Sequence, residues 1–250
     1  MALLEGEHLT KHFGGVVALD DVSFTVDRGE TVGLIGPNGA GKSTLFKVIT
    51  GALSPTSGTV RFDGQEITGK APHTVTSLGL AKTHQIVRPF GNLTLAENVE
   101  VGAQFGREDR DPATVVAENL EFVGLADRAD TYPDELSVGA LKRLEIARVL
   151  ATNPELVLFD EVAGGLDPEE TEQIVELIRE IADRGQTVFL IDHVMRALMS
   201  VSERVFVLNN GAFIAKGTPE EIQNDETVIE AYLGERARDD GDGAAVAGDA

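Results

Sequence analysis

The feature that most constrains the fold is a glycine-rich stretch that directly follows a short apolar segment. Thr31–Ile35 is continuously apolar apart from its first residue, which is typical of a strand buried in a parallel sheet. Residues 36–44 then read GPNGAGKST and fit the phosphate-loop pattern G-x-x-x-x-G-K-[ST]. A helix is expected from about residue 41 to residue 50. A strand, a tight loop and a helix in this order predict an α/β fold.

The residue types of this loop suit a bound triphosphate. Its glycines allow successive backbone N–H groups to curl around phosphate oxygens, and the following helix adds the positive end of its dipole. Lys42 can reach the β- and γ-phosphates, and the Ser43 hydroxyl can bind Mg²⁺. The expected ATP-binding residues of the loop are Gly36, Pro37, Asn38, Gly39, Ala40, Gly41, Lys42, Ser43 and Thr44.

A second motif places two carboxylates at the end of an apolar strand. Residues 156–159 are apolar, and Asp160 and Glu161 follow them. In an open α/β sheet, ligands bind at the carboxyl ends of the strands. Asp160 is therefore expected to hold Mg²⁺ through water, and Glu161 to orient or deprotonate the attacking water.

Hydrophobic patterning divides the chain into strands and helices of an α/β fold with a mostly parallel sheet. Early strands are predicted at 3–9, 16–19, 22–26 and 59–62. Helical patterns at 94–104, 112–123 and 139–152 indicate a helical subdomain inserted at about 86–150. Strands at 156–159 and 187–191 flank a helix at 168–183, and a hairpin of 205–209 and 213–216 turns at Asn210-Gly211. Residues 235–250 are small and acidic, so a disordered tail is expected after a domain spanning 1–234.

Composition excludes several classes of protein. Apolar residues make up 42% of the chain, enough for a core, and there is no cysteine for disulfides or thiolate metal sites. No apolar run approaches membrane-helix length and the N-terminus lacks a signal-peptide pattern, so a soluble, cytoplasmic protein is expected. The net charge of −21 opposes nucleic acid as a partner. We favour an origin in a salt-rich cytoplasm over an ordinary acidic surface, as a hypothesis.

The stretch between the two motifs carries a resemblance to a known family. Residues 136–140 read LSVGA and run into LKRLEIAR at 141–148, which resembles the LSGGQ signature loop and following helix of ABC ATPases. The order of motifs matches as well: phosphate loop, Gln, signature, Asp-Glu, Gly-Leu-Asp and His. The resemblance extends to about residue 234. It implies a P-loop NTPase core with an N-terminal antiparallel β subdomain and an inserted helical subdomain.

The resemblance assigns the signature loop to Ser137, Val138, Gly139 and Ala140, which would contact the ATP of a partner subunit. Val138 replaces the first glycine of the family pattern and Ala140 replaces its glutamine. Because a β-branched residue is less free at positive φ than glycine, Val138 is expected to restrict the backbone there. Function is nevertheless expected to be retained.

Further assignments follow from the resemblance alone. They are Phe13 stacked on adenine, Gln85 at Mg²⁺ and the attacking water, Asp167 at the opposing subunit and His193 at the γ-phosphate. The implied catalytic set is Glu161, His193 and Lys42, and the implied metal set is Ser43, Gln85 and Asp160. Val162 departs from the usual proline after the glutamate, and Asp192 from the usual glutamate before the histidine. The other four histidines have no obvious partners and are interpreted as structural.

The resemblance also implies partners and a mechanism. A head-to-tail dimer with an identical or paralogous ATPase would enclose two ATP molecules and open after hydrolysis. The cofactors would be ATP and Mg²⁺. Since the chain shows no membrane span, separate integral membrane permease subunits and an extracytoplasmic binding protein would be needed, with this chain at the cytoplasmic face of the membrane.

Finer similarities point to a subfamily. Residues 13–19, 217–222 and 228–235 are similar to ATPases of branched-chain amino acid importers. A lipopolysaccharide exporter and a urea importer remain alternatives within the family, and a soluble ATPase of iron–sulfur cluster assembly is an alternative of another class. A DNA-repair ATPase is disfavoured because the roughly 120 residues between the nucleotide motifs leave no room for a long coiled coil.

Overall fold

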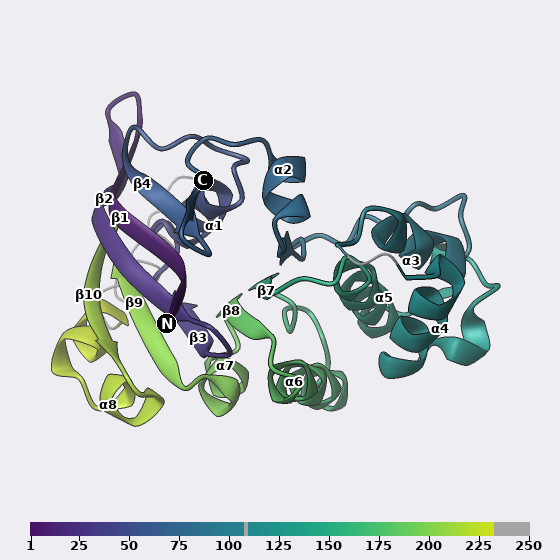
Figure 1. Cartoon of the computed structure of the whole chain (residues 1–250). Helices are drawn as coiled ribbons and strands as arrows, with labels where there is room; N and C mark the ends of the chain where they lie inside the picture. The colour runs from purple at the N-terminus through teal and green to yellow at the C-terminus, as the bar shows by residue number, and fades with distance from the viewer. Residues whose placement is uncertain (108–109, 233–250) are drawn as a thin grey trace, which may run out of the picture.

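The structure is a computed structural model that describes residues 1–107 and 110–232 (Figure 1). The strands are β1 (Ala2–Phe13), β2 (Val16–Asp27), β3 (Thr31–Ile35), β4 (Ser57–Phe62), β5 (Gln65–Glu66), β6 (Leu80–Lys82), β7 (Leu156–Asp160), β8 (Thr187–Ile191), β9 (Arg204–Asn209) and β10 (Ala212–Gly217). The α-helices are α1 (Lys42–Ile49), α2 (Pro72–Ser77), α3 (Leu95–Gln104), α4 (Pro112–Phe122), α5 (Val138–Leu150), α6 (Pro168–Asp183), α7 (Met195–Val201) and α8 (Pro219–Gln223). Two short 3₁₀ helices cover Ala126–Arg128 and Pro133–Glu135. The predicted tail at 235–250 lies outside the described residues.

A six-stranded sheet in the order β10-β9-β3-β8-β7-β6 organises the molecule. Its strands run parallel except β10, which pairs antiparallel with β9. Every residue of β3, β7 and β8 is buried, as expected for strands covered on both faces. The prediction of an α/β fold with a mostly parallel sheet is confirmed.

A second, antiparallel sheet in the order β2-β1-β4-β5 stands beside β9 and β10 (Figure 1). The sequence predicted two short strands at 16–19 and 22–26, but the structure has one strand of 12 residues, β2. The acidic pair between the two apolar runs does not end the strand, because Asp21 adopts φ 52° and the ladder to β1 resumes after an irregular register. The strand predicted at 3–9 likewise continues to Phe13.

Two hydrophobic cores hold the layers together. One lies between the two sheets and includes α1, with Phe46 packed edge-on against Phe189 at a centroid distance of 5.1 Å. The other lies on the opposite side of the large sheet and continues into the helices through residues such as Leu144 and Ile178. The nucleotide-loop helix and the helical segment are therefore packed on separate cores.

Helices α3, α4 and α5 gather into a group to one side of the sheets (Figure 1). Each begins at a capping side chain: Thr94 accepts from the Glu97 N–H, Asp111 from the Thr114 N–H, and Ser137 from the Ala140 N–H. The helices predicted from hydrophobic periodicity at 94–104 and 112–123 are confirmed. The third helix, predicted from residue 139, begins one residue earlier at Val138.

Short elements were not predicted from the sequence. Strand β6 has three residues, too few to show an alternating pattern, and α2 has six. The predicted hairpin turn is confirmed, with Asn210 at φ 47° and Gly211 at φ 83°. Among the described residues, every helix is too short or too polar to cross a membrane.

Candidate active site

The phosphate-loop residues connect β3 to α1 at the carboxyl edge of the large sheet. The loop needs glycine at two places for both backbone and space. Gly36 has φ 153° and a Cβ there would lie 1.9 Å from the Leu208 carbonyl oxygen. Gly41 has φ 108° and a Cβ would lie 2.4 Å from the Ala18 carbonyl oxygen. The loop is thus packed tightly against neighbouring backbone at both glycines, where no other residue would fit.

Lys42 spans the loop that precedes it. Its Nζ donates to the carbonyl oxygens of Gly36 at 2.5 Å and Pro37 at 2.9 Å, and the residue is 7% exposed. Ser43 is exposed, and Thr44 is partly exposed. The ammonium is therefore held across the loop rather than extended into solvent, and it provides the positive charge that phosphate recognition requires.

The two predicted motifs meet at the same edge of the sheet. Leu34 on β3 and Asp160 on β7 both pair with Ile191 of the strand between them, β8. Strands two positions apart in a sheet are separated by roughly 10 Å. The phosphate loop and the carboxylates Asp160 and Glu161 therefore flank one space beyond the strand ends.

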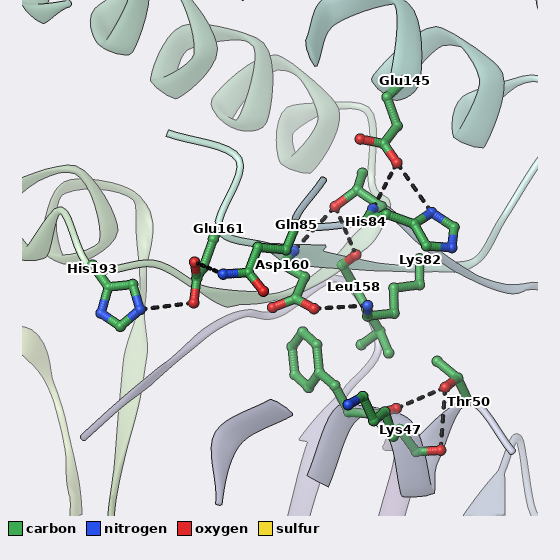
Figure 2. A network of polar contacts seen from close by, with 12 residues as sticks. Lys47, Thr50, Lys82, His84, Gln85, Glu145, Leu158, Asp160, Glu161 and His193 are labelled. Atoms are coloured by element: carbon green, nitrogen blue, oxygen red, sulfur yellow. Dashed lines mark hydrogen bonds and ion pairs between the residues drawn. The ribbon is translucent and has the colours of Figure 1, made fainter. Parts of the chain in front are cut away.

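Glu161 lies between Gln85 and His193 (Figure 2). The family resemblance assigned Gln85 to Mg²⁺ and the attacking water, and His193 to the γ-phosphate. Gln85 Nε2 donates to its Oε2 at 2.6 Å, and His193 Nε2 lies 2.7 Å from its Oε1. The carboxylate is mostly buried whereas His193 is half exposed. The structure thus joins the three predicted residues in one cluster, where a carboxylate could accept a proton from a bound water.

Two buried charged side chains, Lys142 and Asp192, hold the backbone next to this cluster. Lys142 on α5 donates to the Glu161 carbonyl oxygen at 2.9 Å, and burial lowers the pKa of its ammonium, although Asp192 counteracts this. The Asp192 carboxylate accepts the N–H groups of Ala163 and Val194, and burial raises its pKa. Aspartate in place of the family's glutamate thus links the Glu161 loop to the His193 loop.

Asp160 provides the test of whether a metal ion suits this site. Its Oδ2 pairs with Lys82 Nζ at 2.7 Å, while its Oδ1 is buried and has no hydrogen-bond partner within the described part of the chain. The described residues also contain no cluster of three or more Asp, Glu, His or Cys side chains that could hold a metal by themselves. A carboxylate oxygen without a partner and few protein ligands fit Mg²⁺, which keeps waters and shares its coordination with phosphates.

Two of the other four histidines have partners that the sequence did not reveal. These histidines had no obvious partners in the sequence and were interpreted as structural. In the structure, the His84 N–H donates to Glu145 Oε1 at 2.7 Å and its ring Nδ1 lies 3.1 Å from the same oxygen. His8 Nδ1 lies 2.6 Å from Asp21 Oδ1. The pairs join residues distant in sequence, so local patterns did not reveal them.

The signature-loop residues lie away from this chain's own phosphate loop. Figure 1 shows α1 beside the antiparallel sheet and α5 in the helical group across the molecule. Ser137 caps α5, and its hydroxyl lies 3.5 Å from Glu170 on α6. Gly139 and Ala140 are buried in the first turn, and a Cβ on Gly139 would meet the Glu170 carboxylate at 2.6 Å.

The structure contradicts one expectation about this region and shows where a second residue of it lies. Val138 was expected to restrict the backbone, but it is the first residue of α5 and has no positive φ, so valine fits without strain. Asp167 is exposed and caps α6 by accepting the Glu170 N–H at 2.8 Å. Both Val138 and Asp167 are accessible to another molecule.

Phe13 lies at the end of β1 and is 48% exposed. Lys11 Nζ lies 5.3 Å from the centre of its ring. Phe13 is therefore not buried in a hydrophobic core, and its exposed ring is available for stacking.

Residues that sequence reasoning missed surround the predicted ones. Lys82, Thr83, Lys142 and Glu145 hold the carboxylate motif and the Gln85 segment through buried contacts. Lys82 follows only two apolar residues, and Lys142 and Glu145 stand among other charged residues of α5, so the local sequence does not mark them. Their partners are set by how β6, β7 and α5 pack together.

Comparisons with known proteins give a consistent result. A family model described as "ABC transporter" matches residues 19–164, and one described as "Branched-chain amino acid ATP-binding cassette transporter" matches residues 214–238. The high-affinity branched-chain amino acid transport ATP-binding protein BraF of Pseudomonas aeruginosa is 39% identical, covering 93% of this chain and 98% of BraF.

Solved structures agree with these matches. The ADP conformation of MJ1267, an ATP-binding cassette of an ABC transporter, superposes with a TM-score of 0.85 at 33% identity, covering 94% of this chain and 100% of that one. A dimeric structure of MJ0796, a bacterial ABC transporter cassette, gives a TM-score of 0.78 at 27% identity, covering 86% of this chain and 98% of that one.

Proposed function

This chain belongs to the ABC transporter family as an ATP-hydrolysing subunit, and we propose that it powers the uptake of branched-chain amino acids through separate membrane permease chains. The assignment of ATP hydrolysis to this site rests on the contact of Glu161 with both Gln85 and His193 beside the phosphate loop. The substrate class is supported by the family match at 214–238 and by the similarity to BraF over 93% of the chain.

Nucleotide binding is assigned to the loop and to one aromatic ring. The backbone N–H groups of residues 36–44, except Pro37, which has none, bind the phosphates together with the α1 N-terminus. Lys42 turns from its carbonyl partners to neutralise the β- and γ-phosphates. Phe13 stacks on the adenine, which its exposure at the end of β1 permits.

Mg²⁺ is assigned to Ser43, Gln85 and Asp160. The unpaired Asp160 Oδ1 supports this assignment, as do the oxygen donors of the other two side chains. When bound, the ion neutralises charge on the phosphate oxygens.

Hydrolysis is assigned to Glu161, with His193 and Lys42 as catalytic partners. Glu161 accepts a proton from the attacking water, and Gln85 and His193 orient its carboxylate until substrate arrives. Lys42 and the loop N–H groups stabilise the charge on the transferred phosphoryl group.

A second ATPase subunit, identical or paralogous, completes each site. Ser137, Val138, Gly139 and Ala140 contact the partner's ATP, and Asp167 contacts the partner subunit. Support comes from the separation of α5 from α1 within one chain and from the dimeric cassette that this fold resembles. After hydrolysis the phosphate contacts are lost and the dimer opens.

Permease chains dock beside Gln85 in this proposal. Ile86 is 67% exposed and Phe90 is 42% exposed on the loop that follows Gln85, so an apolar partner surface could cover them. Such docking places the chain at the cytoplasmic face of the membrane. An extracytoplasmic binding protein would deliver the substrate.

Uptake by cells tests the substrate class. Deleting the gene should abolish high-affinity uptake of labelled leucine, isoleucine and valine, and the wild-type gene should restore it, whereas the Glu161→Gln gene should not. If the deletion strain takes up leucine normally, the substrate proposal is wrong. Loss of urea uptake, loss of lipopolysaccharide export or defective iron–sulfur proteins in that strain would then favour the urea importer, the lipopolysaccharide exporter or the iron–sulfur assembly ATPase, respectively.

A further inference from the structure

Asp160 is already paired with a cation that belongs to the chain itself. Lys82 Nζ lies 2.7 Å from Asp160 Oδ2, and the two side chains are 18% and 8% exposed (Figure 2). Because an ion pair with so little water around it is weakly screened, the ammonium neutralises much of the charge of this carboxylate.

The strand pairing holds Lys82 in this position. Strand β6 pairs with β7 so that Lys82 aligns with Leu158, two residues before Asp160. Thr83 extends the contact, since its N–H donates to the Leu158 carbonyl oxygen at 2.9 Å and its hydroxyl accepts the Asp160 N–H at 3.1 Å. Both the backbone and the side chain of Asp160 are therefore held by neighbouring residues at the end of β6.

The same short segment also holds the second carboxylate. Gln85, three residues after Lys82, donates to Glu161 at 2.6 Å. The end of β6 and the loop after it thus supply a partner to Asp160, which ends β7, and to Glu161, which follows it (Figure 2). A ligand that draws Asp160 away must break or weaken the Lys82 contact.

We propose that Lys82 is a built-in counter-cation of Asp160, which competes with Mg²⁺ and thereby sets the metal concentration needed for tight nucleotide binding. The inference rests on the proposed assignment of Asp160 to Mg²⁺. Lys82 is a positioning residue in this account. It holds the Asp160 carboxylate in place without metal, and its positive charge weakens the attraction of that carboxylate for a divalent ion.

The test separates the charge of Lys82 from its hydrogen bond. Lys82→Gln removes the charge but keeps a donor, and Lys82→Arg keeps the charge. Lys47→Gln makes the same change in net charge at an exposed position on α1. For each purified full chain, fluorescence of N-methylanthraniloyl-ADP is measured first with EDTA and then during titration with MgCl₂.

Removing the positive charge should make Asp160 more attractive to the metal, so Lys82→Gln should lower the Mg²⁺ midpoint about tenfold. Lys82→Arg and Lys47→Gln should stay within about twofold of the wild type. An unchanged midpoint in folded Lys82→Gln, or an equal shift in Lys47→Gln, would overturn the inference. If the wild type binds no nucleotide either with EDTA or with Mg²⁺, the proposed function itself is wrong.

A measurement on the wild-type chain is independent of how the variants fold. Acetylation of lysines in ADP-bound protein is compared by mass spectrometry with EDTA and with Mg²⁺. Labelling of Lys82 should rise with Mg²⁺, because the metal takes its carboxylate partner, while labelling of exposed Lys47 should not change. Equal or reduced labelling of Lys82 with Mg²⁺ contradicts the competition.

Discussion

At the scale of single residues, Glu161 combines an unfavourable backbone with a well-supported side chain. Its φ is 56°, a region that non-glycine residues seldom occupy. The conformation is maintained because its N–H donates to the Ile191 carbonyl oxygen at 2.8 Å and its own carbonyl oxygen accepts from Lys142. Such strain at a carboxylate motif is typical of a functional position.

Replacing Glu161 by glutamine should separate binding from hydrolysis. The amide keeps the shape of the side chain but cannot accept a proton, so ATP should still bind while hydrolysis falls at least 100-fold, within the usual range of about 10²–10⁴ for a general base. Phosphate release and nucleotide binding measure the two effects. Glu169→Gln, at an exposed position on α6, is the matched control. Near-normal turnover in Glu161→Gln would remove the residue from its catalytic role.

Lys42 should act at the binding step. Loss of its ammonium removes charge-assisted hydrogen bonds to phosphate, so Lys42→Ala should weaken ATP binding by tenfold or more, on the order of 1.5–3 kcal/mol. Calorimetric titration of ATP checks this. Lys47→Ala removes a lysine from the exposed side of the same helix and should bind ATP normally. Equal affinities in the two variants would contradict the role of Lys42.

At the scale of elements, helix starts coincide with several site residues. Ser137 caps α5, Asp167 caps α6, and the phosphate loop forms the start of α1. The first turn of a helix has N–H groups without partners inside the helix. A residue at the N-cap can therefore both stabilise the start of the helix and lie where an anion binds. Ser137 therefore stabilises α5 as its cap and, in the proposed dimer, would also contact the partner's ATP.

Two substitutions at Ser137 should separate these effects. Alanine removes the cap and should lower the free energy of unfolding by about 1 kcal/mol, whereas asparagine is an equally good cap and should preserve it. Both should reduce ATPase activity, because neither provides the hydroxyl that is proposed to meet the partner's phosphate. Urea denaturation and ATPase assays measure the two properties. Full activity in Ser137→Asn would show that only capping matters.

At the scale of the whole molecule, the net charge of −21 is the dominant property. Acidic residues outnumber basic ones by 42 to 21, so half of the carboxylates have no basic side chain to balance them. Self-repulsion of this kind opposes the compact state and is screened by salt. Local ion pairs such as Arg204–Glu30 offset only part of it.

The hypothesis of a salt-rich cytoplasm predicts a strong dependence of stability on KCl. The screening length falls from about 10 Å at 0.1 M to about 3 Å at 1 M, so the melting temperature should rise over this range. Differential scanning calorimetry measures it. Glycine betaine at matched osmolality controls for exclusion of solutes from the surface. A melting temperature that does not respond to KCl would count against the hypothesis.

Features that depend on neighbouring residues could be predicted from the sequence alone. The strand Thr31–Ile35, the loop that ends at Lys42 and the acidic pair at 160–161 are each encoded within about ten residues, where covalent geometry limits the alternatives. The same holds for the helices α3, α4 and α6, whose periodicity spans several turns. The choice of Glu161 as a site residue followed from the local carboxylate motif, whereas that of His193 followed only from the family resemblance.

Only the tertiary structure decided which of these pieces meet. The order β3-β8-β7-β6 brings the phosphate loop and Asp160 to one edge and places Lys82 against that carboxylate. It also pairs His84 with Glu145, although 61 residues separate them. Strand β2 runs through Asp21 because hydrogen bonds to β1 outweigh the local turn preference of two aspartates. Such contacts arise from the folding of distant segments onto common cores, and no local pattern specifies them.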